Sequence, residues 1–209
     1  KAEKTVGLLI EFGDEKPYDE IIEVANTTSP QGALHADGWQ LAEALVTASP
    51  GVGLLLPVAD CNAVTFYDPE HKVIALAHLG WHSTVNNLAA KLVGYLAKNH
   101  HTNPGKLLVH FSPSIRKESY RFTSLSNTPD TSWHNQPYAT KQPDGTYAID
   151  LLKYNLDALK KAGVEQGNIE VATNDTGQDP NYYSHFARYN DSQVHRSKGR
   201  FAVLAMMAI

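Results

Sequence analysis

The sequence predicts an α/β fold, because strand-like and helix-like segments alternate along the chain. Short apolar runs of strand length recur from the beginning of the chain to its end, and two intervening segments carry apolar residues at helical spacing. The 209 residues are 42% hydrophobic, which is enough to bury a full core. No linker interrupts the alternation, so we expect one domain over residues 1–209.

The first half of the chain is expected to supply most of the strands. Residues 6–12 form a short apolar run of strand type, whereas residues 18–25 fit either a strand or a short helix. Three further strands are predicted at residues 51–58, 63–67 and 73–77. A polar turn joins the last two strands. The resulting hairpin or meander carries Cys61 at its head and His78 at its far end.

A helix is predicted to follow His78. Ser83 or Thr84 can cap it, and apolar residues from Val85 onward recur at helical spacing. This helix is expected to end near Asn99. Its capped end lies beside His78, and the unpaired backbone N–H groups there could hold an anion such as phosphate.

The second half repeats the alternation. Strands are predicted at residues 107–111, 169–172 and 201–207. Asp150 can cap a helix that ends at Gly163, a residue type favoured just beyond a helix C-terminus. Residues 123–146 are polar and rich in Pro, Asn, Ser and Thr, so we expect a long surface loop there.

Composition narrows the class of protein. A net charge of −4 and a pI of about 6.2 provide no broad basic field for nucleic acid. One cysteine excludes an intrachain disulfide and fits a reducing, cytoplasmic compartment. No apolar run approaches the roughly 20 residues that a membrane-spanning helix needs. We therefore expect a soluble protein that binds neither nucleic acid nor a membrane.

The most informative residues are Cys61, the only cysteine, and His78, which follows it 17 residues later. A thiolate and an imidazole can both bind zinc while leaving a position for substrate. They can equally act as a nucleophile and its base. A single cysteine can also be a small buried hydrophobe, and the two residues alone do not decide among these roles.

Successive segments of the chain, taken in order, carry a family resemblance. They are Ala42-Glu43-Ala44-Leu45-Val46-Thr47, Ser49-Pro50-Gly51-Val52, Ala59-Asp60-Cys61, His78-Leu79-Gly80-Trp81, Ser112-Pro113-Ser114-Ile115 leading to Tyr120, Asp150-Leu151 with Asn155, Tyr182-Tyr183-Ser184-His185 and Gly199-Arg200-Phe201-Ala202. With them the chain resembles the YfiH family, the laccase-domain or polyphenol oxidase proteins, from about residue 40 to residue 207.

This resemblance implies a layered α/β sandwich of mixed β-sheets flanked by helices, related to Cys/His deamidase toxins. It also implies one zinc ion held by His, Cys and His, with copper as the metal of the family's older naming. Cys61 and His78 match the second and third ligands in type and spacing. His35, the only histidine before Cys61, takes the first position by elimination; its other interpretation is a surface loop residue beside Asp37.

The implied activity is phosphorolysis of purine nucleosides, with adenosine deamination as a further reaction, so a nucleoside and phosphate are the expected partners. Three residues are candidates for catalysis. Asp60 could orient a ligand, transfer a proton or cap a turn. His82 could hold an anion or face solvent, and it stands where the family has an arginine. Arg200 could point into the cleft or lie at the surface.

Three functional hypotheses follow from these residues. A zinc-dependent purine nucleoside phosphorylase rests on His35, Cys61 and His78 together. A copper-dependent polyphenol oxidase (laccase) would need several copper sites, for which a single cysteine and few candidate ligands are a poor match. A metal-free hydrolase or deamidase needs only Cys61 as nucleophile and His78 as base.

Overall fold

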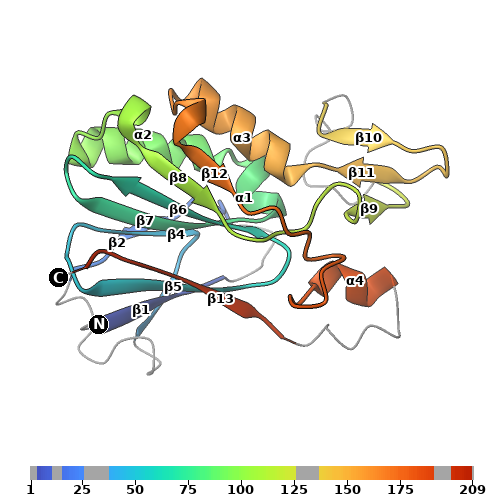
Figure 1. Ribbon diagram of the computed structural model, residues 1–209, viewed down its shortest axis with the longest axis horizontal. Coiled ribbons are helices and arrows are strands. Elements are labelled where there is room, and N and C mark those ends of the chain that lie inside the picture. The colour runs from blue at the N-terminus through green and yellow to red at the C-terminus, as the bar shows by residue number, and fades with distance from the viewer. Residues whose placement is uncertain (1–3, 11–15, 26–37, 126–136, 191–198, 209) are drawn as a thin grey trace.

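The structure, a computed structural model, describes residues 4–10, 16–25, 38–125, 137–190 and 199–208. Two β-sheets face each other, helices cover the far side of one of them, and a small third sheet lies at one end (Figure 1). This arrangement confirms the expected layered α/β sandwich. His35, the predicted first ligand, lies outside the described residues.

The six-stranded central sheet carries the candidate site. Its order is β12 (Ile169–Val171), β8 (Leu108–Phe111), β6 (Asn62–Asp68), β7 (Val73–Leu79), β4 (Ala44–Thr47) and β2 (Ile21–Glu23). β6 and β7 form an antiparallel hairpin in which Ala63 pairs with His78. The hairpin therefore brings the segment that contains Cys61 beside His78, as predicted.

The four-stranded outer sheet packs on the central sheet. Its order is β13 (Phe201–Met206), β5 (Val52–Val58), β1 (Lys4–Leu9) and β3 (Trp39–Leu41). The layer between the sheets contains Leu8, Leu54, Leu56, Leu45 and Leu76, each 1% exposed or less. Burying one such side chain stabilises the fold by about 1.5–3 kcal/mol. The two sheets therefore hold the strand ends around the site in fixed positions.

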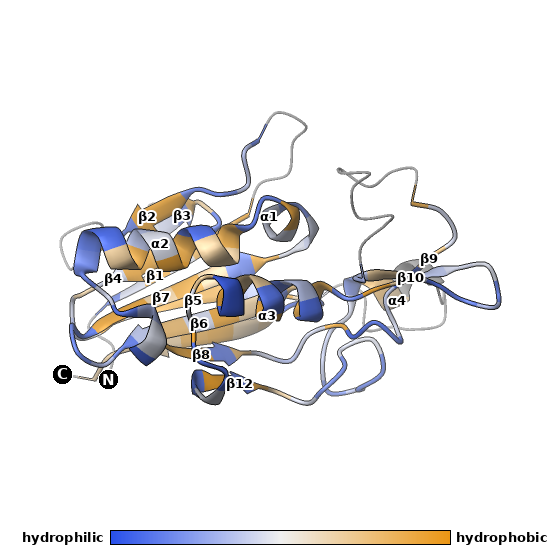
Figure 2. Cartoon of the chain, turned by 90° about the horizontal axis from the view of Figure 1, so that it is seen from above, coloured by the Kyte–Doolittle hydropathy of each residue, from blue (hydrophilic) through white to orange (hydrophobic). Residues whose placement is uncertain are grey.

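Helices cover the other face of the central sheet. α2 (Leu88–His100) and α3 (Leu151–Lys161) lie over this face of the sheet, and polar residues recur on their outer side (Figure 2). Leu92, Leu96 and Leu159 belong to the buried cluster on this face, together with Phe66 and Phe111. In the described part of the chain, no helix is both long and apolar enough to span a bilayer.

The helix predicted from Ser83 or Thr84 to Asn99 is wrong in its first part. The chain forms two helices, α1 (Trp81–Val85) and α2, and Asn87 lies between them with a left-handed φ of 59°. This conformation interrupts a right-handed helix, and Asn is one of the few residues that adopt it readily. The predicted anion-binding helix end therefore belongs to a helix of only 5 residues.

Other segments follow the predictions closely. The ambiguous residues 18–25 contain strand β2, which pairs in parallel with β4. Asp150 caps α3, since its Oδ1 accepts a hydrogen bond from the amide of Lys153 at 2.9 Å. Gly163 follows the helix with a φ of 94°, a conformation that favours glycine.

The surface loop predicted at residues 123–146 is partly wrong. β10 (Ala139–Lys141) and β11 (Tyr147–Ile149) form a hairpin, and β9 (Arg121–Phe122) completes a small sheet with β11. The turn of the hairpin contains Gly145 at a φ of 86°. The polar composition of this segment concealed β10, because the strand buries little apolar surface.

Candidate active site

Cys61 and His78 meet at one end of the β6–β7 hairpin. Cys61 directly precedes β6, and His78 is the second-last residue of β7. A Cβ added to Gly80 would lie 2.8 Å from Cε1 of His78 and 3.1 Å from Sγ of Cys61. Cys61 is also close enough to raise the pKa of the imidazole. Gly80 therefore leaves the space in which the sulfur and the ring approach each other.

Glu43 orients the imidazole of His78. Nδ1 of His78 donates a hydrogen bond to Oε2 of Glu43 at 2.8 Å, and the two residues are 7% and 5% exposed. The backbone N–H of His78 donates to the carbonyl of Glu43, also at 2.8 Å. Because an ionised carboxylate only accepts hydrogen bonds, Nδ1 carries the proton. Nε2 is therefore the nitrogen left for Cys61 or a ligand.

The same contacts determine the charge of His78. Burial by itself lowers the pKa of an imidazole, because desolvation disfavours the charged ring. Cys61 and Glu43 outweigh burial and raise the pKa of His78 to about 10. The protonated imidazole therefore places a positive charge next to Cys61.

A pocket of about 600 Å³ opens onto this pair. Its apolar wall comes from β1, β3 and the end of β5, with Leu9, Trp39 and Pro57 among its residues. The polar lining residues are Cys61, His78, His185 and Arg200. The volume is typical of small-molecule sites, which are mostly apolar with a few polar groups.

Asp60 connects this pocket to the C-terminal part of the chain. Its Oδ1 accepts a hydrogen bond from Oγ1 of Thr176, and its Oδ2 accepts one from the amide of Phe186, both at 2.7 Å. Phe186 lies in the short helix α4 (His185–Asn190). Because the chain engages both carboxylate oxygens, Asp60 positions α4 next to Cys61.

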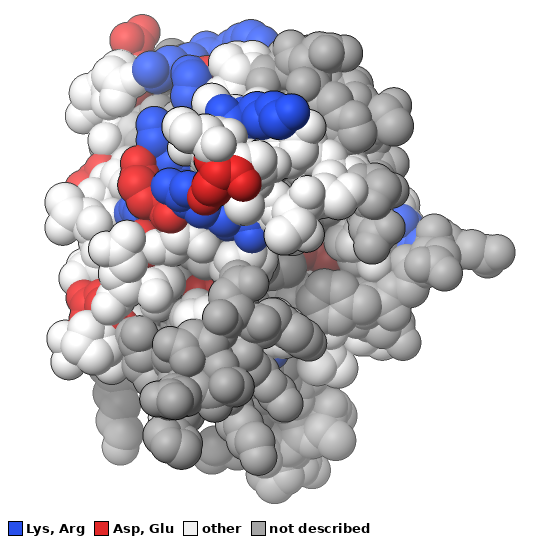
Figure 3. All heavy atoms as spheres, turned by 90° about the vertical axis from the view of Figure 1, so that its right-hand side faces the viewer, with Lys and Arg blue, Asp and Glu red and all other residues white. Residues whose placement is uncertain are grey.

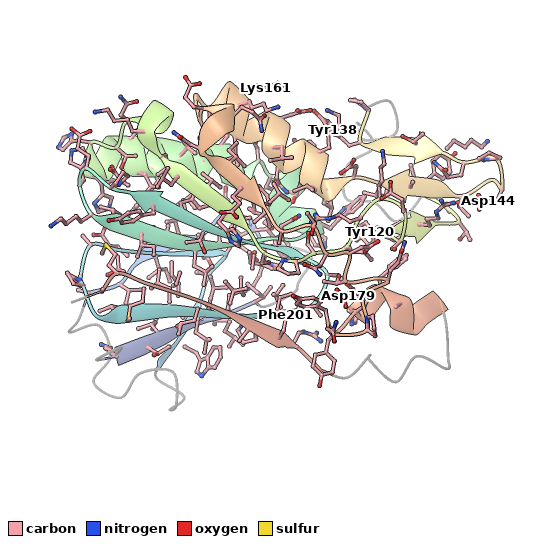
Figure 4. All side chains as sticks on the ribbon, viewed as in Figure 1. Tyr120, Tyr138, Asp144, Lys161, Asp179 and Phe201 are labelled. Atoms are coloured by element: carbon pink, nitrogen blue, oxygen red, sulfur yellow. The ribbon has the colours of Figure 1, made fainter. Side chains whose placement is uncertain are left out.

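Tyr120 lies close to the same residues. Burial, followed by the charges of Cys61 and Asp60, raises the pKa of Tyr120 well above its usual value. Its ring makes edge contacts with Phe122 and Phe186, each with 4.8 Å between ring centroids. Figure 4 shows Tyr120 in the region between α4 and the small sheet. Its hydroxyl therefore keeps its proton at neutral pH and can donate a hydrogen bond.

The predicted catalytic residues occupy different places. Arg200 is exposed, lines the pocket and donates a hydrogen bond from Nη1 to the carbonyl of Gly199 at 2.8 Å. His82 stacks on Tyr18, with ring centroids 4.4 Å apart, and is not among the described residues that line the pocket. The structure thus brings Asp60, Cys61 and His78 together, with Arg200 at the rim.

Sequence analysis missed roles for three residues: Glu43, Tyr120 and His185. Glu43 had a local signal, because it is a single acid in the otherwise uncharged segment 42–47. Tyr120 and His185 stand in or next to segments that carry the family resemblance, but nothing in those segments indicated a role at the site, which both residues reach from far along the chain.

The side chains at the site supply part of the ligand set that zinc prefers. Thiolate sulfur and imidazole nitrogen are ligands that zinc prefers, and a carboxylate on the far nitrogen of a histidine is the usual outer contact of a metal ligand. Within the described residues, no group of three His, Cys, Asp or Glu side chains could hold a metal ion. A third side-chain ligand would have to come from the remaining residues, among which is His35.

Surface charge at this end of the molecule is mixed. Over the described residues, Lys and Arg side chains lie next to Asp and Glu (Figure 3), as in the pair of Arg121 and Asp144, whose charged atoms are 3.5 Å apart. This mixture lends no support to binding of a nucleic-acid backbone, which requires clustered positive charge.

Comparison with known proteins identifies the family to which the chain belongs. A family model described as multi-copper polyphenol oxidoreductase laccase matches residues 18–208. The chain is 28% identical over 151 residues to "Purine nucleoside phosphorylase" of Bacteroides thetaiotaomicron, covering 71% of this chain and 54% of the relative. It is 24% identical over 184 residues to "Purine nucleoside phosphorylase YlmD" of Bacillus subtilis, covering 83% and 64%. The chain thus spans only 54–64% of these relatives' length.

Solved structures share the fold. The Bacillus licheniformis hypothetical protein YfiH superposes with a TM-score of 0.74 at 26% identity, covering 95% of this chain and 74% of that one. YlmD from Geobacillus stearothermophilus superposes with a TM-score of 0.78 at 23% identity, covering 99% and 74%. At such identity the second likeness is evidence for the fold alone.

Proposed function

We propose that this chain, which belongs to the multi-copper polyphenol oxidoreductase laccase family, cleaves purine nucleosides with phosphate. In this reaction the bond between ribose C1′ and the purine nitrogen breaks, a phosphate oxygen bonds to C1′, and the base leaves with a proton. Relatives named purine nucleoside phosphorylase support the proposal. The observation that carries it is the pairing of Cys61 with His78 at an apolar pocket of about 600 Å³.

The pocket suits a purine nucleoside chemically. The indole of Trp39 lies directly over Gly7, where a Cβ would collide with it, so the ring forms a flat part of the apolar wall. Aromatic rings stack favourably on such surfaces. Arg200, which lines the same pocket, is a cation for phosphate.

Zinc is the proposed cofactor, and Cys61, His78 and His35 would hold it; copper is the alternative that the family's description suggests. When bound, the metal would supply a Lewis acid at the polar end of the pocket. Glu43 would keep Nε2 of His78 directed at this place, and Gly80 would keep it clear. Deamination of adenosine is proposed as a second reaction of the same site.

The other predicted catalytic residues receive proposed roles of different kinds. Asp60 positions α4 through its two hydrogen bonds, and its proposed effect on the reaction is indirect. His82 would contact an anion only if one approached the start of α1, where the ring stacks on Tyr18.

A second candidate function is a metal-free thiol hydrolase or deamidase. The chain of contacts from Cys61 through His78 to Glu43 favours it, because this order of thiol, imidazole and carboxylate activates nucleophiles in many enzymes. Sγ would bond to an amide carbonyl carbon while His78 passes a proton to the departing ammonia. Water would then hydrolyse the thioester and restore the thiol.

Chromatography of reaction products tests the proposal. Purified protein is incubated with adenosine, inosine or guanosine plus phosphate, with and without a chelator. We expect free base and ribose 1-phosphate from the untreated protein, and neither product from Cys61→Ala or after chelation. His110→Gln, an exposed histidine on β8, is the control.

Three outcomes would contradict the proposal. If zinc-loaded protein releases no base from any nucleoside, phosphorolysis is wrong. If a chelated sample hydrolyses amides and Glu43→Gln removes that activity, the thiol hydrolase takes its place. If a copper-loaded sample oxidises phenols at a rate that Cys61→Ala abolishes, the oxidase takes its place.

A further inference from the structure

The backbone of His78 is held as closely as its side chain. Its N–H donates a hydrogen bond to the carbonyl of Glu43, and its Nδ1 donates to the carboxylate of the same residue, each at 2.8 Å. The carbonyl of His78 accepts a hydrogen bond from Oγ of Ser83, also at 2.8 Å. Two residues therefore engage every polar group of His78 except Nε2, the nitrogen left for Cys61 or a ligand.

The hydroxyl of Ser83 also holds Gly80. The N–H of Gly80 donates to Oγ of Ser83 at 3.0 Å, so one hydroxyl bridges the carbonyl before Leu79 and the amide after it. Ser83 is 1% exposed, and a buried carbonyl or amide that loses its partner is destabilising. Ser83 thus fixes the short stretch of backbone that sets the place of the His78 ring.

The helix that carries Ser83 depends on a contact with α3. α1 has only 5 residues, and so short a helix is marginal without tertiary contacts. From α3, Nδ2 of Asn155 donates a hydrogen bond to Oγ1 of Thr84 at 3.0 Å, and both residues are 0% exposed. A series of buried hydrogen bonds therefore leads from α3 through α1 to His78.

The carboxamide of Asn155 is only partly satisfied. Its Nδ2 donates a second hydrogen bond to the carbonyl of Leu151 at 3.0 Å, whereas its Oδ1 accepts no hydrogen bond from the described residues. An apolar side chain of similar shape would avoid this unfavourable burial. The hydrogen bond to α1 therefore explains a polar residue at this position better than stability does.

We propose that Ser83 is a positioning residue for His78, and that Asn155 holds Ser83 in place through Thr84 and α1. None of these three residues is among the described residues that line the pocket, so they act on the direction of Nε2 and not on a ligand. The assignment rests on the proposed role of His78. It applies equally to phosphorolysis and to thiol hydrolysis, because both would use Cys61 and His78 together.

Hydrogen exchange at the His78 ring tests the assignment without metal, nucleoside or phosphate. Metal-free protein with isotope-labelled histidine is followed by NMR, and His78→Ala identifies the Nδ1–H signal. We expect this proton to exchange about tenfold faster or more in Ser83→Ala, because the backbone beside the ring loses two hydrogen bonds. Asn155→Leu should increase the rate by roughly threefold, and Ser83→Thr, which keeps the hydroxyl, should recover part of the slow exchange.

A matched control removes another buried bridging hydroxyl. Oγ1 of Thr47 donates to the carbonyl of Val24 and accepts from the amide of Ser49, and Thr47 is 0% exposed. Thr47→Val should therefore lower the melting temperature much as Ser83→Ala does, while the His78 proton keeps its slow exchange.

Asn155→Leu has its own control. Nδ2 of Asn168 donates to the carbonyl of Gly105 at 2.9 Å, away from α1. Asn168→Leu removes this hydrogen bond and should leave the exchange of the His78 proton unchanged.

The outcomes separate this assignment from the proposed function. If Ser83→Ala leaves the ring proton slow, if Thr47→Val accelerates its exchange equally, or if His78→Ala removes no slowly exchanging proton, the assignment is wrong even where base is released. If Ser83→Ala alone accelerates the exchange and no nucleoside is cleaved, the assignment stands and phosphorolysis falls.

Discussion

The two sides of the candidate site are built differently. On one side, Glu43, Cys61 and His78 lie on or next to strands of the central sheet, and His78 hydrogen bonds to Glu43 and lies beside Cys61. On the other side, His185 and Arg200 are exposed; His185 is the first residue of α4, and Arg200 directly precedes β13. Asp60, next to Cys61, hydrogen bonds to the amide beside His185 and so joins the two sides.

This difference suggests that the buried side carries out the chemistry and that the exposed side determines which ligand binds. Sheet register holds the buried side, so a small displacement there would disturb many backbone hydrogen bonds. The exposed side can change its residues without altering the sheet, as loops on rigid scaffolds do. We therefore expect substitutions on the buried side to affect turnover or metal binding, and those on the exposed side to affect affinity for one substrate.

The largest effect on catalysis is expected from Gly80→Ala, because the added methyl group would force the His78 ring and the Cys61 sulfur apart. The new methyl group would lie 2.8 Å from the His78 ring, which cannot retreat because Glu43 holds it. Displacement of about 1 Å can cost on the order of 100-fold in rate, so kcat/KM for base release should fall by about that factor. Gly94→Ala is the control, because a Cβ there meets nothing within 4 Å. Equal activity of both variants would contradict the geometry.

Glu43→Gln should have the next largest effect. The amide keeps the size of the side chain but can turn its NH₂ toward Nδ1, so His78 loses its fixed tautomer. Zinc affinity should fall by roughly 10- to 100-fold, as for other outer partners of metal ligands. Competition with a metal-binding dye measures it, and Glu70→Gln, an exposed partner of Lys106, serves as control. Unchanged affinity would show that Glu43 does not orient the ring.

Asp60→Asn should have a moderate effect and tests the link between the two sides. Asn suits the left-handed φ of 74° at this position, so the backbone is preserved. The NH₂ group of Asn takes the place of one carboxylate oxygen of Asp60. It cannot accept the hydrogen bond that this oxygen receives, from either the Phe186 amide or the Thr176 hydroxyl. The free energy of unfolding should fall by about 1–3 kcal/mol, and the KM for phosphate should rise.

Urea unfolding and steady-state kinetics measure both effects of Asp60→Asn. A loss of kcat at unchanged stability and unchanged phosphate KM would instead identify Asp60 as a proton-transfer group.

The smallest effect is expected from His82→Ala. His82 stacks on Tyr18 outside the described lining of the pocket, so kcat/KM should change by less than about threefold. A larger rise in the KM for phosphate than in the KM for inosine would place His82 in the anion site and extend the exposed side of the pocket.

Local patterns predicted the segments whose structure depends on local chemistry. The strands around Cys61 and His78 and the cap of α3 at Asp150 are present. The break at Asn87 was not predicted, because one residue in a left-handed conformation leaves no trace in apolar spacing. The strand β4 was missed because it depends on pairing with β2 and β7.

The candidate site, like the fold, was predictable only where its residues lie close together in the sequence. Cys61 and His78 could be paired because one hairpin carries both. Glu43 reaches His78 across 35 residues of chain, and Phe186 reaches Asp60 across 126. Such contacts follow from sheet order and helix placement, which no single segment of the sequence specifies.

The metal content of protein purified without added metal tests the central claim most directly, namely that Cys61 and His78 act as one unit. We expect about one zinc per chain in the unaltered protein and none in Cys61→Ala or His78→Ala, with melting temperatures close to that of the parent after metal is removed from all three. Full zinc occupancy in either variant, or nucleoside cleavage by metal-free protein at the full rate, would contradict the claim.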